Sequence, residues 1–153
     1  MKRMTIMLVA LALTLLTVTP AIAAANPKFM AKFTTATLDG NNLDVDFKMS
    51  GLGSFATVDI EVTATATRLD ACVNGGGNVP SDAKKTATTA AVSDSGTFPV
   101  RNGQVTGSLT LMPPATSLSC PPGQQATLFS VSYTNVVISG AGVSHSIGGT
   151  FGS

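Results

Sequence analysis

Aromatic side chains are scarce in this chain. Its 153 residues include no tryptophan, one tyrosine (Tyr133) and seven phenylalanines. Sugar-binding sites commonly stack an aromatic ring against the sugar, and in a domain this small the phenylalanines are needed for the core. The scarcity therefore argues against a carbohydrate site built on aromatic stacking. The tryptophan that packs on the disulfide of antibody domains is missing as well.

Charged residues are also few, at 11% of the chain, with nine basic and eight acidic side chains. Two of the basic residues, Lys2 and Arg3, belong to the N-terminal segment, so 9 − 2 = 7 basic residues stand against eight acidic ones in the rest. Without a basic patch, the sequence predicts no nucleic-acid partner. Serine, threonine, alanine, glycine and valine dominate instead, so the surface is expected to be polar through hydroxyl groups.

Residues 1–25 have the pattern of a secretory signal peptide. Lys2 and Arg3 precede an uncharged, largely apolar stretch over residues 4–18, and Pro20 breaks a helix just before a run of small residues. A basic start, a short apolar stretch and small residues at alternate positions are typical of a cleaved export signal. The apolar stretch is shorter than the roughly 20 residues of a membrane-spanning helix.

Cleavage is expected after Ala23 or Ala25, with an uncleaved anchor as the alternative. Residues 26–153 would then form the mature protein, which is long enough for one domain. No cysteine for lipid attachment follows the apolar stretch, and no second apolar run occurs near the C-terminus. We therefore expect a secreted, extracellular protein with no transmembrane anchor after signal removal.

The chain has only two cysteines, Cys72 and Cys120. In an oxidising compartment, an even pair in a small domain predicts a disulfide. A redox pair or a metal site is the alternative, but the two cysteines are isolated and the single histidine, His145, is distant in sequence. The sequence predicts neither a cofactor nor a metal.

The dominant hydrophobic period in the mature chain is two, which is typical of strands with one buried face. The clearest run alternates polar residues with Val58, Ile60, Val62, Ala64 and Ala66. Two hairpins are predicted from turn residues that accept positive φ. Asn102-Gly103 would join strands over 97–101 and 104–112, and residues 39–42 would join strands over 28–38 and 43–49, with Leu43, Val45, Phe47 and Met49 on one face.

Three further strands are predicted over residues 81–93, 128–139 and 143–151, the last after a turn at 140–142. In the second of them, apolar residues fall at alternate positions with an interruption at Asn135: Phe129, Val131, Tyr133 and Val137. About seven to nine strands in one domain predict an all-β fold, namely a two-sheet antiparallel sandwich of immunoglobulin-like type. A small β-barrel is the structural alternative.

Two segments, residues 74–80 and 113–123, are too rich in glycine or proline for regular structure. The predicted disulfide would tie them together. Binding residues tend to lie on loops that a rigid scaffold holds, so both segments are candidate contact loops. The candidate contact residues are Asn74, Asn78, Ser117 and Gln124. The alternative is that these loops only connect strands.

Four short motifs carry a resemblance to known proteins: CVNGGGNVP at 72–80, RNGQVTGS at 101–108, CPPGQ at 120–124 and VSYTNV at 131–136. Together they resemble a group of uncharacterised exported bacterial proteins, over most of the mature chain. The resemblance implies export, a β-rich fold and paired cysteines. It implies no activity, so no functional residue is carried over.

No catalytic residue is predicted. His145 lies between two serines, but neighbours on a strand point to opposite faces and cannot form a nucleophile and base pair. Residues 39–46 resemble a calcium loop, yet Leu43 stands where an EF-hand needs an oxygen ligand. The carboxylates of Asp44 and Asp46 share a face, as do those of Asp59 and Glu61, which would suit a hydrolase with paired carboxylates.

By elimination, the sequence predicts a secreted noncatalytic β-sandwich protein. It would act as a binding or surface-associated structural module with an extracellular or envelope partner that the sequence does not identify. The alternative is an exported hydrolase that uses a carboxylate or His145.

Overall fold

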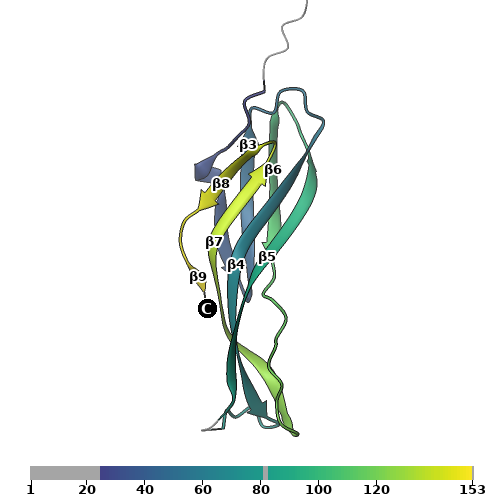
Figure 1. Cartoon of the computed structure of the whole chain (residues 1–153). Coiled ribbons are helices and arrows are strands. Elements are labelled where there is room, and N and C mark those ends of the chain that lie inside the picture. Colours follow the sequence, from purple (N-terminus) through teal and green to yellow (C-terminus); the bar gives the residue numbers. More distant parts are fainter. Residues whose placement is uncertain (1–24, 81–82, 153) are drawn as a thin grey trace, which may run out of the picture.

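The structure is a computed structural model that describes residues 25–80 and 83–152. Apart from Ala25, the predicted signal peptide lies outside the described residues. The rest of the chain forms two antiparallel sheets that pack face to face (Figure 1). The first sheet contains β1 (Lys28–Phe29), β2 (Thr35–Asp39), β3 (Asn42–Ser50) and β6 (Gln104–Leu111).

The second sheet is longer and has the order β5-β4-β7-β8, with β9 also paired to β7. Its strands are β4 (Thr57–Asn74), β5 (Lys85–Pro99), β7 (Gln124–Gly140), β8 (Val143–Ile147) and β9 (Phe151–Gly152). The predicted all-β, two-sheet antiparallel sandwich is thus confirmed, and the sheets do not close into the alternative barrel. The described part of the chain contains no helix with the length and apolar character needed to cross a membrane.

The core forms where the apolar faces of the two sheets meet. On β3, the four residues predicted to share a face are all at most 1% exposed: Leu43, Val45, Phe47 and Met49. The alternating residues of β4 are buried opposite them, from Val58 to Ala66. The predicted turn at Asn102-Gly103 is present, with φ of 51° and 69°, which a type I′ turn requires. The hairpin predicted around it is wrong, because β5 before the turn pairs with β4 in the second sheet and β6 after it pairs with β3 in the first. Only Arg101 and Gln104 bridge across the turn, which therefore connects the two sheets.

The prediction of one strand over residues 28–38 is wrong. The segment divides into β1, a 3₁₀ turn η1 (Ala31–Phe33) and β2, and both strands pair with the same side of β3. The Thr34 side chain supports the break, because its hydroxyl donates a hydrogen bond to the Met30 carbonyl at 3.1 Å. The predicted strand over 143–151 is likewise divided into β8 and β9.

The predicted common face of β7 is only half correct. Val131 and Tyr133 are buried, but Phe129 is 48% exposed and Val136, not Val137, enters the core. The exchange of Val137 for Val136 follows from a β-bulge at Asn135, where φ is 54° and the register to β4 shifts. Phe129 lies at a second register shift, between Leu69 and Asp70 of β4. An extra residue reverses which side chains point inward.

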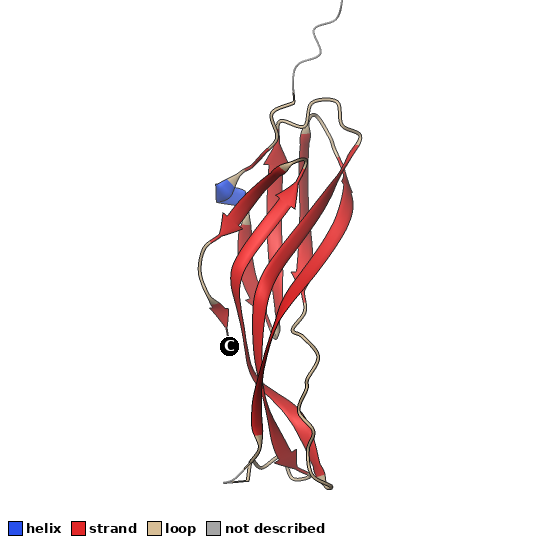
Figure 2. Ribbon diagram, viewed as in Figure 1, coloured by secondary structure: helices blue, strands red, loops and turns tan. Residues whose placement is uncertain are grey.

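The long second sheet extends well beyond the sandwich (Figures 1 and 2). Sheet one ends near Leu43 and Leu111, where the Tyr133 hydroxyl donates a hydrogen bond of 2.7 Å to the Asn41 carbonyl. Past this level, residues 68–74, 85–88 and 124–131 continue as a three-stranded projection, which we call the arm. At about 3.3 Å per residue, β4 alone gives the molecule a length of roughly 60 Å.

Candidate functional site

The arm has no second sheet to cover it. An irregular segment, residues 112–123, runs down one side of it instead and is called the strap (Figure 2). Three polar contacts hold the strap to β4 and β5. Arg68 donates to the Pro114 carbonyl at 2.7 Å, the hydroxyls of Thr88 and Ser117 lie 2.8 Å apart, and the Lys84 ammonium is 3.4 Å from the Ser119 carbonyl.

A disulfide fixes the strap near the end of the arm. Cys72 lies on β4 and is bonded to Cys120 of the strap, with Cα atoms 5.6 Å apart. Leu118 packs beside it and is buried. The predicted disulfide is confirmed. It joins a strand to the strap rather than joining two loops. The disulfide therefore holds the strap covalently against β4 of the arm.

Three of the four predicted contact residues lie together at the tip of the arm. Asn74 and Gln124 are register partners at the ends of β4 and β7, and Asn78 lies in the loop that follows β4. The Asn74 side chain accepts a hydrogen bond of 3.1 Å from the Asn78 amide, and the Asn74 amide donates to the Asn78 carbonyl at 3.1 Å. This closed turn exposes Val79, which is 40% accessible.

Ser117 is not at the tip. Its hydroxyl is bonded to Thr88 on β5, so it helps to fasten the strap. Sequence reasoning placed it with the other three because it treated residues 113–123 as one loop. The structure instead divides this segment between a strap along the arm and a short turn at Pro121–Gly123, where the Gln124 amide donates to the Pro121 carbonyl at 3.1 Å.

The arm also contains a buried ion pair that sequence reasoning missed. The Arg68 guanidinium lies 2.7 Å from Asp70, whose side chain is 1% exposed. One carboxylate oxygen of Asp70 and the Nε of Arg68 have no partner among the described atoms. The sequence did contain an indication of this pair. Arg68 and Asp70 continue the alternate positions, from Val58 to Ala66, whose side chains point into the protein.

The residues of the hydrolase alternative do not form one cluster: Asp59 and Glu61 line one open depression, and His145 lies elsewhere. His145 on β8 lies against Phe29, with ring centroids 6.5 Å apart. No hydrogen bond or ion pair among the described residues links His145 to a carboxylate. Within residues 25–80 and 83–152, no group of three histidine, cysteine or acidic side chains could hold a metal ion.

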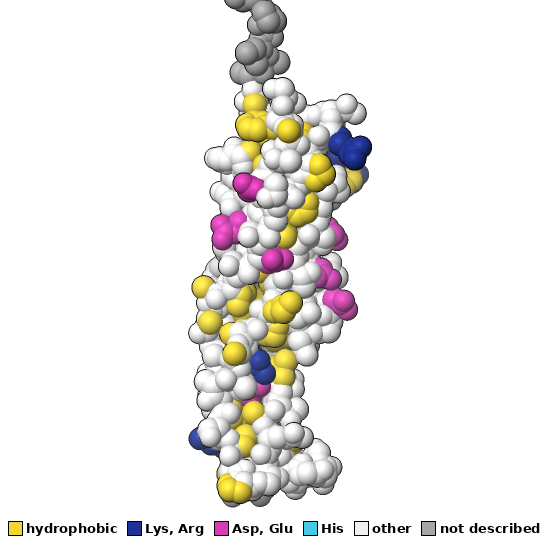
Figure 3. Space-filling model, turned by 90° about the vertical axis from the view of Figure 1, so that its right-hand side faces the viewer, with side chains coloured by type: hydrophobic (Ala, Val, Ile, Leu, Met, Phe, Trp, Pro, Cys, Tyr) yellow, Lys and Arg dark blue, Asp and Glu magenta, His cyan; other side chains and the backbone are white. Residues whose placement is uncertain are grey.

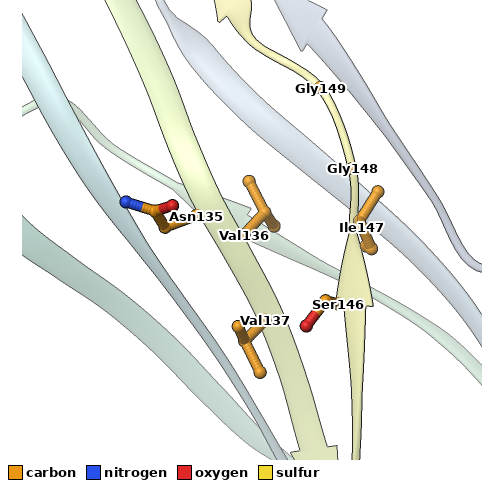
Figure 4. Close-up of a pocket in the computed structure, with 7 residues that line it drawn as sticks. All are labelled: Asn135, Val136, Val137, Ser146, Ile147, Gly148 and Gly149. Carbon is orange, nitrogen blue, oxygen red and sulfur yellow. The ribbon is translucent and has the colours of Figure 1, made fainter.

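The described surface has several shallow, open hollows. One of about 260 Å³ lies between β7 and the end of β8, where the chain turns away at Gly148 and Gly149 (Figure 4). Its walls come from Val136, Val137 and Ile147, and none of its lining residues titrates. Tyr133 is buried at the base of the sandwich, and desolvation raises the pKa of its hydroxyl above the ordinary value of 10.0. This tyrosine joins the sheets and has no open cavity in front of it.

Comparisons of the chain with protein-family models, with curated proteins and with solved structures gave no match. A functional proposal therefore rests on the sequence and the geometry of the molecule.

Proposed function

We propose that this chain is an exported, noncatalytic binding module that contacts an envelope or extracellular partner through the tip of its arm. The observation that carries the proposal is the arm itself. A sandwich needs no such projection to bury its core, yet here three strands continue past the core and a disulfide-anchored strap covers them. Rigid scaffolds that hold exposed loops are the usual platform for binding residues.

Three features support export and contact at the tip. The cysteine pairing is typical of oxidising, extracytoplasmic compartments. The N-terminal segment has the pattern of a secretory signal. The exposed Asn78 and Val79 lie at the opposite end of the molecule from Asn26, whose amide donates a hydrogen bond of 2.9 Å to the Gly51 carbonyl. A chain attached near Asn26 would thus present the tip away from its point of attachment.

The hydrolase alternative has less support. It requires His145 or two carboxylates to converge in a cleft. His145 lies against Phe29, and Asp59 and Glu61 line an open depression in which Asp59 already accepts a hydrogen bond from the Thr97 hydroxyl. We therefore place it second.

The test is affinity capture with the secreted, oxidised protein from envelope and culture-fluid fractions of the producing cells. We expect a discrete partner that the wild type retains and Val79→Lys, at the tip, loses. Ser54→Lys is the matched control, because Ser54 is an exposed loop residue at the other end of the rod. Equal capture by both variants would place the contact elsewhere.

A further inference from the structure

The outer face of the second sheet carries an extended array of hydroxyl groups. Figure 1 looks onto this face, with β4, β5, β7 and β8 in front. The residues of β4 that point outward begin with Asp59 and Glu61 and continue with Thr63, Thr65 and Thr67, opposite the buried positions of the same strand. We call this surface, with its neighbours on β5, β7 and β8, the hydroxyl face.

Register places the neighbours in rows across the sheet. Glu61 is flanked by Ser95 and Ser139, and Ser139 pairs in turn with Ser144 of β8. Residues directly opposite one another on paired strands share a face, so this row presents three hydroxyls beside one carboxylate.

The rows below repeat the pattern. Thr67 is flanked by Thr89 and Ser132, with the Thr67 and Thr89 hydroxyls 2.9 Å apart. Thr65 pairs with Thr134. Adjacent rows lie about 6.6 Å apart along the strands and neighbouring hydroxyls about 4.8 Å apart across them. The array is therefore an extended surface rather than a pocket for one small molecule.

One end of the face does have a hollow. Asp59, Glu61, Ser95 and Ser139 line an open depression of about 380 Å³. One oxygen of Asp59 accepts a hydrogen bond from the Thr97 hydroxyl, and Glu61 has no hydrogen bond to any described residue. Carboxylates in such a place are acceptors for hydroxyl donors, and hydrogen bonds to charged groups are stronger than those between neutral groups.

The chemistry of the face selects one class of ligand. None of its outward positions from Asp59 to Thr67, or their register partners, is lysine, arginine or aromatic. Anionic polymers are disfavoured because the only charges are the carboxylates of Asp59 and Glu61. Lipids are disfavoured because Val137 and Ala91 are the only apolar side chains in the rows. Figure 3, which views an adjacent side, shows few charged groups on a surface that is otherwise mostly uncharged.

We infer that the hydroxyl face binds a neutral polysaccharide. A chain of sugars supplies hydroxyl donors for Glu61 and Asp59 and both donors and acceptors for the serine and threonine rows. The sugar would lie along the face without an aromatic platform, so each contact is weak and affinity comes from their number. This inference goes beyond the proposed function, because it concerns a surface far from the tip.

The test is a depletion assay with the secreted, oxidised protein and three insoluble neutral polymers: cellulose, chitin and starch granules. We expect retention on at least one polymer, undiminished in about 1 M NaCl because no ion pairs are involved. The double variant Glu61→Gln/Thr63→Val should lower the association constant roughly tenfold. Its fold is checked by an unchanged unfolding midpoint.

The matched control is Asp46→Asn. Asp46 is an exposed carboxylate on the outer face of the other sheet, flanked in register by Thr35 and Ser108. Its row resembles that of Glu61, but Lys48 two positions along adds a cation to this face, and Asp46 does not line the depression at Glu61. We expect this variant, and Val79→Lys at the tip, to bind within twofold of wild type. Absence of retention on all three polymers, loss of binding in salt, or an equal loss with Asp46→Asn would overturn the inference. Val79→Lys changes only the tip of the arm. Loss of partner capture by this variant would therefore test the proposed function, and its retention on the polymer would test the hydroxyl face separately.

Discussion

The buried ion pair of the arm leads to a sharp prediction about stability. In Arg68→Leu, the Asp70 carboxylate would stay in a site where its side chain is 1% exposed, without its 2.7 Å partner. Breaking a buried pair by removing one partner costs about 3–5 kcal/mol, because an uncompensated charge remains. The Pro114 carbonyl would also lose its donor, for about 1 kcal/mol more. We expect a total loss near 4 kcal/mol, since Arg68 is itself 15% exposed and water can reach part of the site.

The double variant Arg68→Leu/Asp70→Leu is the control. It removes both charges, and replacement of a buried pair by apolar residues is often neutral. The assay is urea unfolding of the oxidised protein, with the free energy of unfolding compared across the wild type, both single variants and the double variant. A loss below about 1 kcal/mol for Arg68→Leu, or a double variant as unstable as the single one, would refute the reasoning.

Three other predictions concern the same measurement of unfolding free energy. Cys72→Ser should lower it by roughly 4 kcal/mol, because the disulfide closes a long loop. By mass spectrometry, the oxidised wild type should be lighter by two hydrogens than the reduced protein. Tyr133→Phe should cost about 1–3 kcal/mol by leaving the Asn41 carbonyl without its donor; a neutral result would mean that water replaces the bond. Gly107→Ala should cost about 1–3 kcal/mol, since a Cβ there would lie 2.5 Å from the Phe98 ring and 2.8 Å from the Phe47 ring; equal stability would show that both rings can move aside.

The sequence predicted the elements whose signal is local. The alternation from Val58 to Ala66 and the Asn102-Gly103 turn needed no information from elsewhere in the chain, and both predictions are confirmed. The disulfide followed from cysteine count and compartment and is confirmed as well. The immunoglobulin-like type of the sandwich stays a prediction.

The predicted inward and outward faces were wrong where one extra residue changes which side chains of a strand point into the core. The bulge at Asn135 shifts β7 by one position, so Val136 and Ile138 replace Val137 in the core. Asparagine was noticed as an interruption, but an interruption in sequence does not tell whether the strand ends, bends or bulges. Which of these three occurs depends on how the neighbouring strand pairs with the segment on either side of the interruption.

The arm could not be predicted, because its existence depends on where the other sheet ends. A strand pattern over β4 looks the same whether a second sheet or a strap covers it. Arg68 and Asp70 were the available signal, since two charges at inward positions are unusual in a sandwich core and suit a site beside polar backbone groups. Recognising them would have marked the point where the core stops.

The central claim is that the tip of the arm makes the functional contact, and site-specific photocrosslinking in the secreting cells tests it most directly. A photoreactive residue would replace Asn78 at the tip or, as the control, Ser54 at the far end of the rod. The account predicts a discrete crosslinked product from position 78 and none from position 54. A product from position 54 alone, or none from either position, would contradict it.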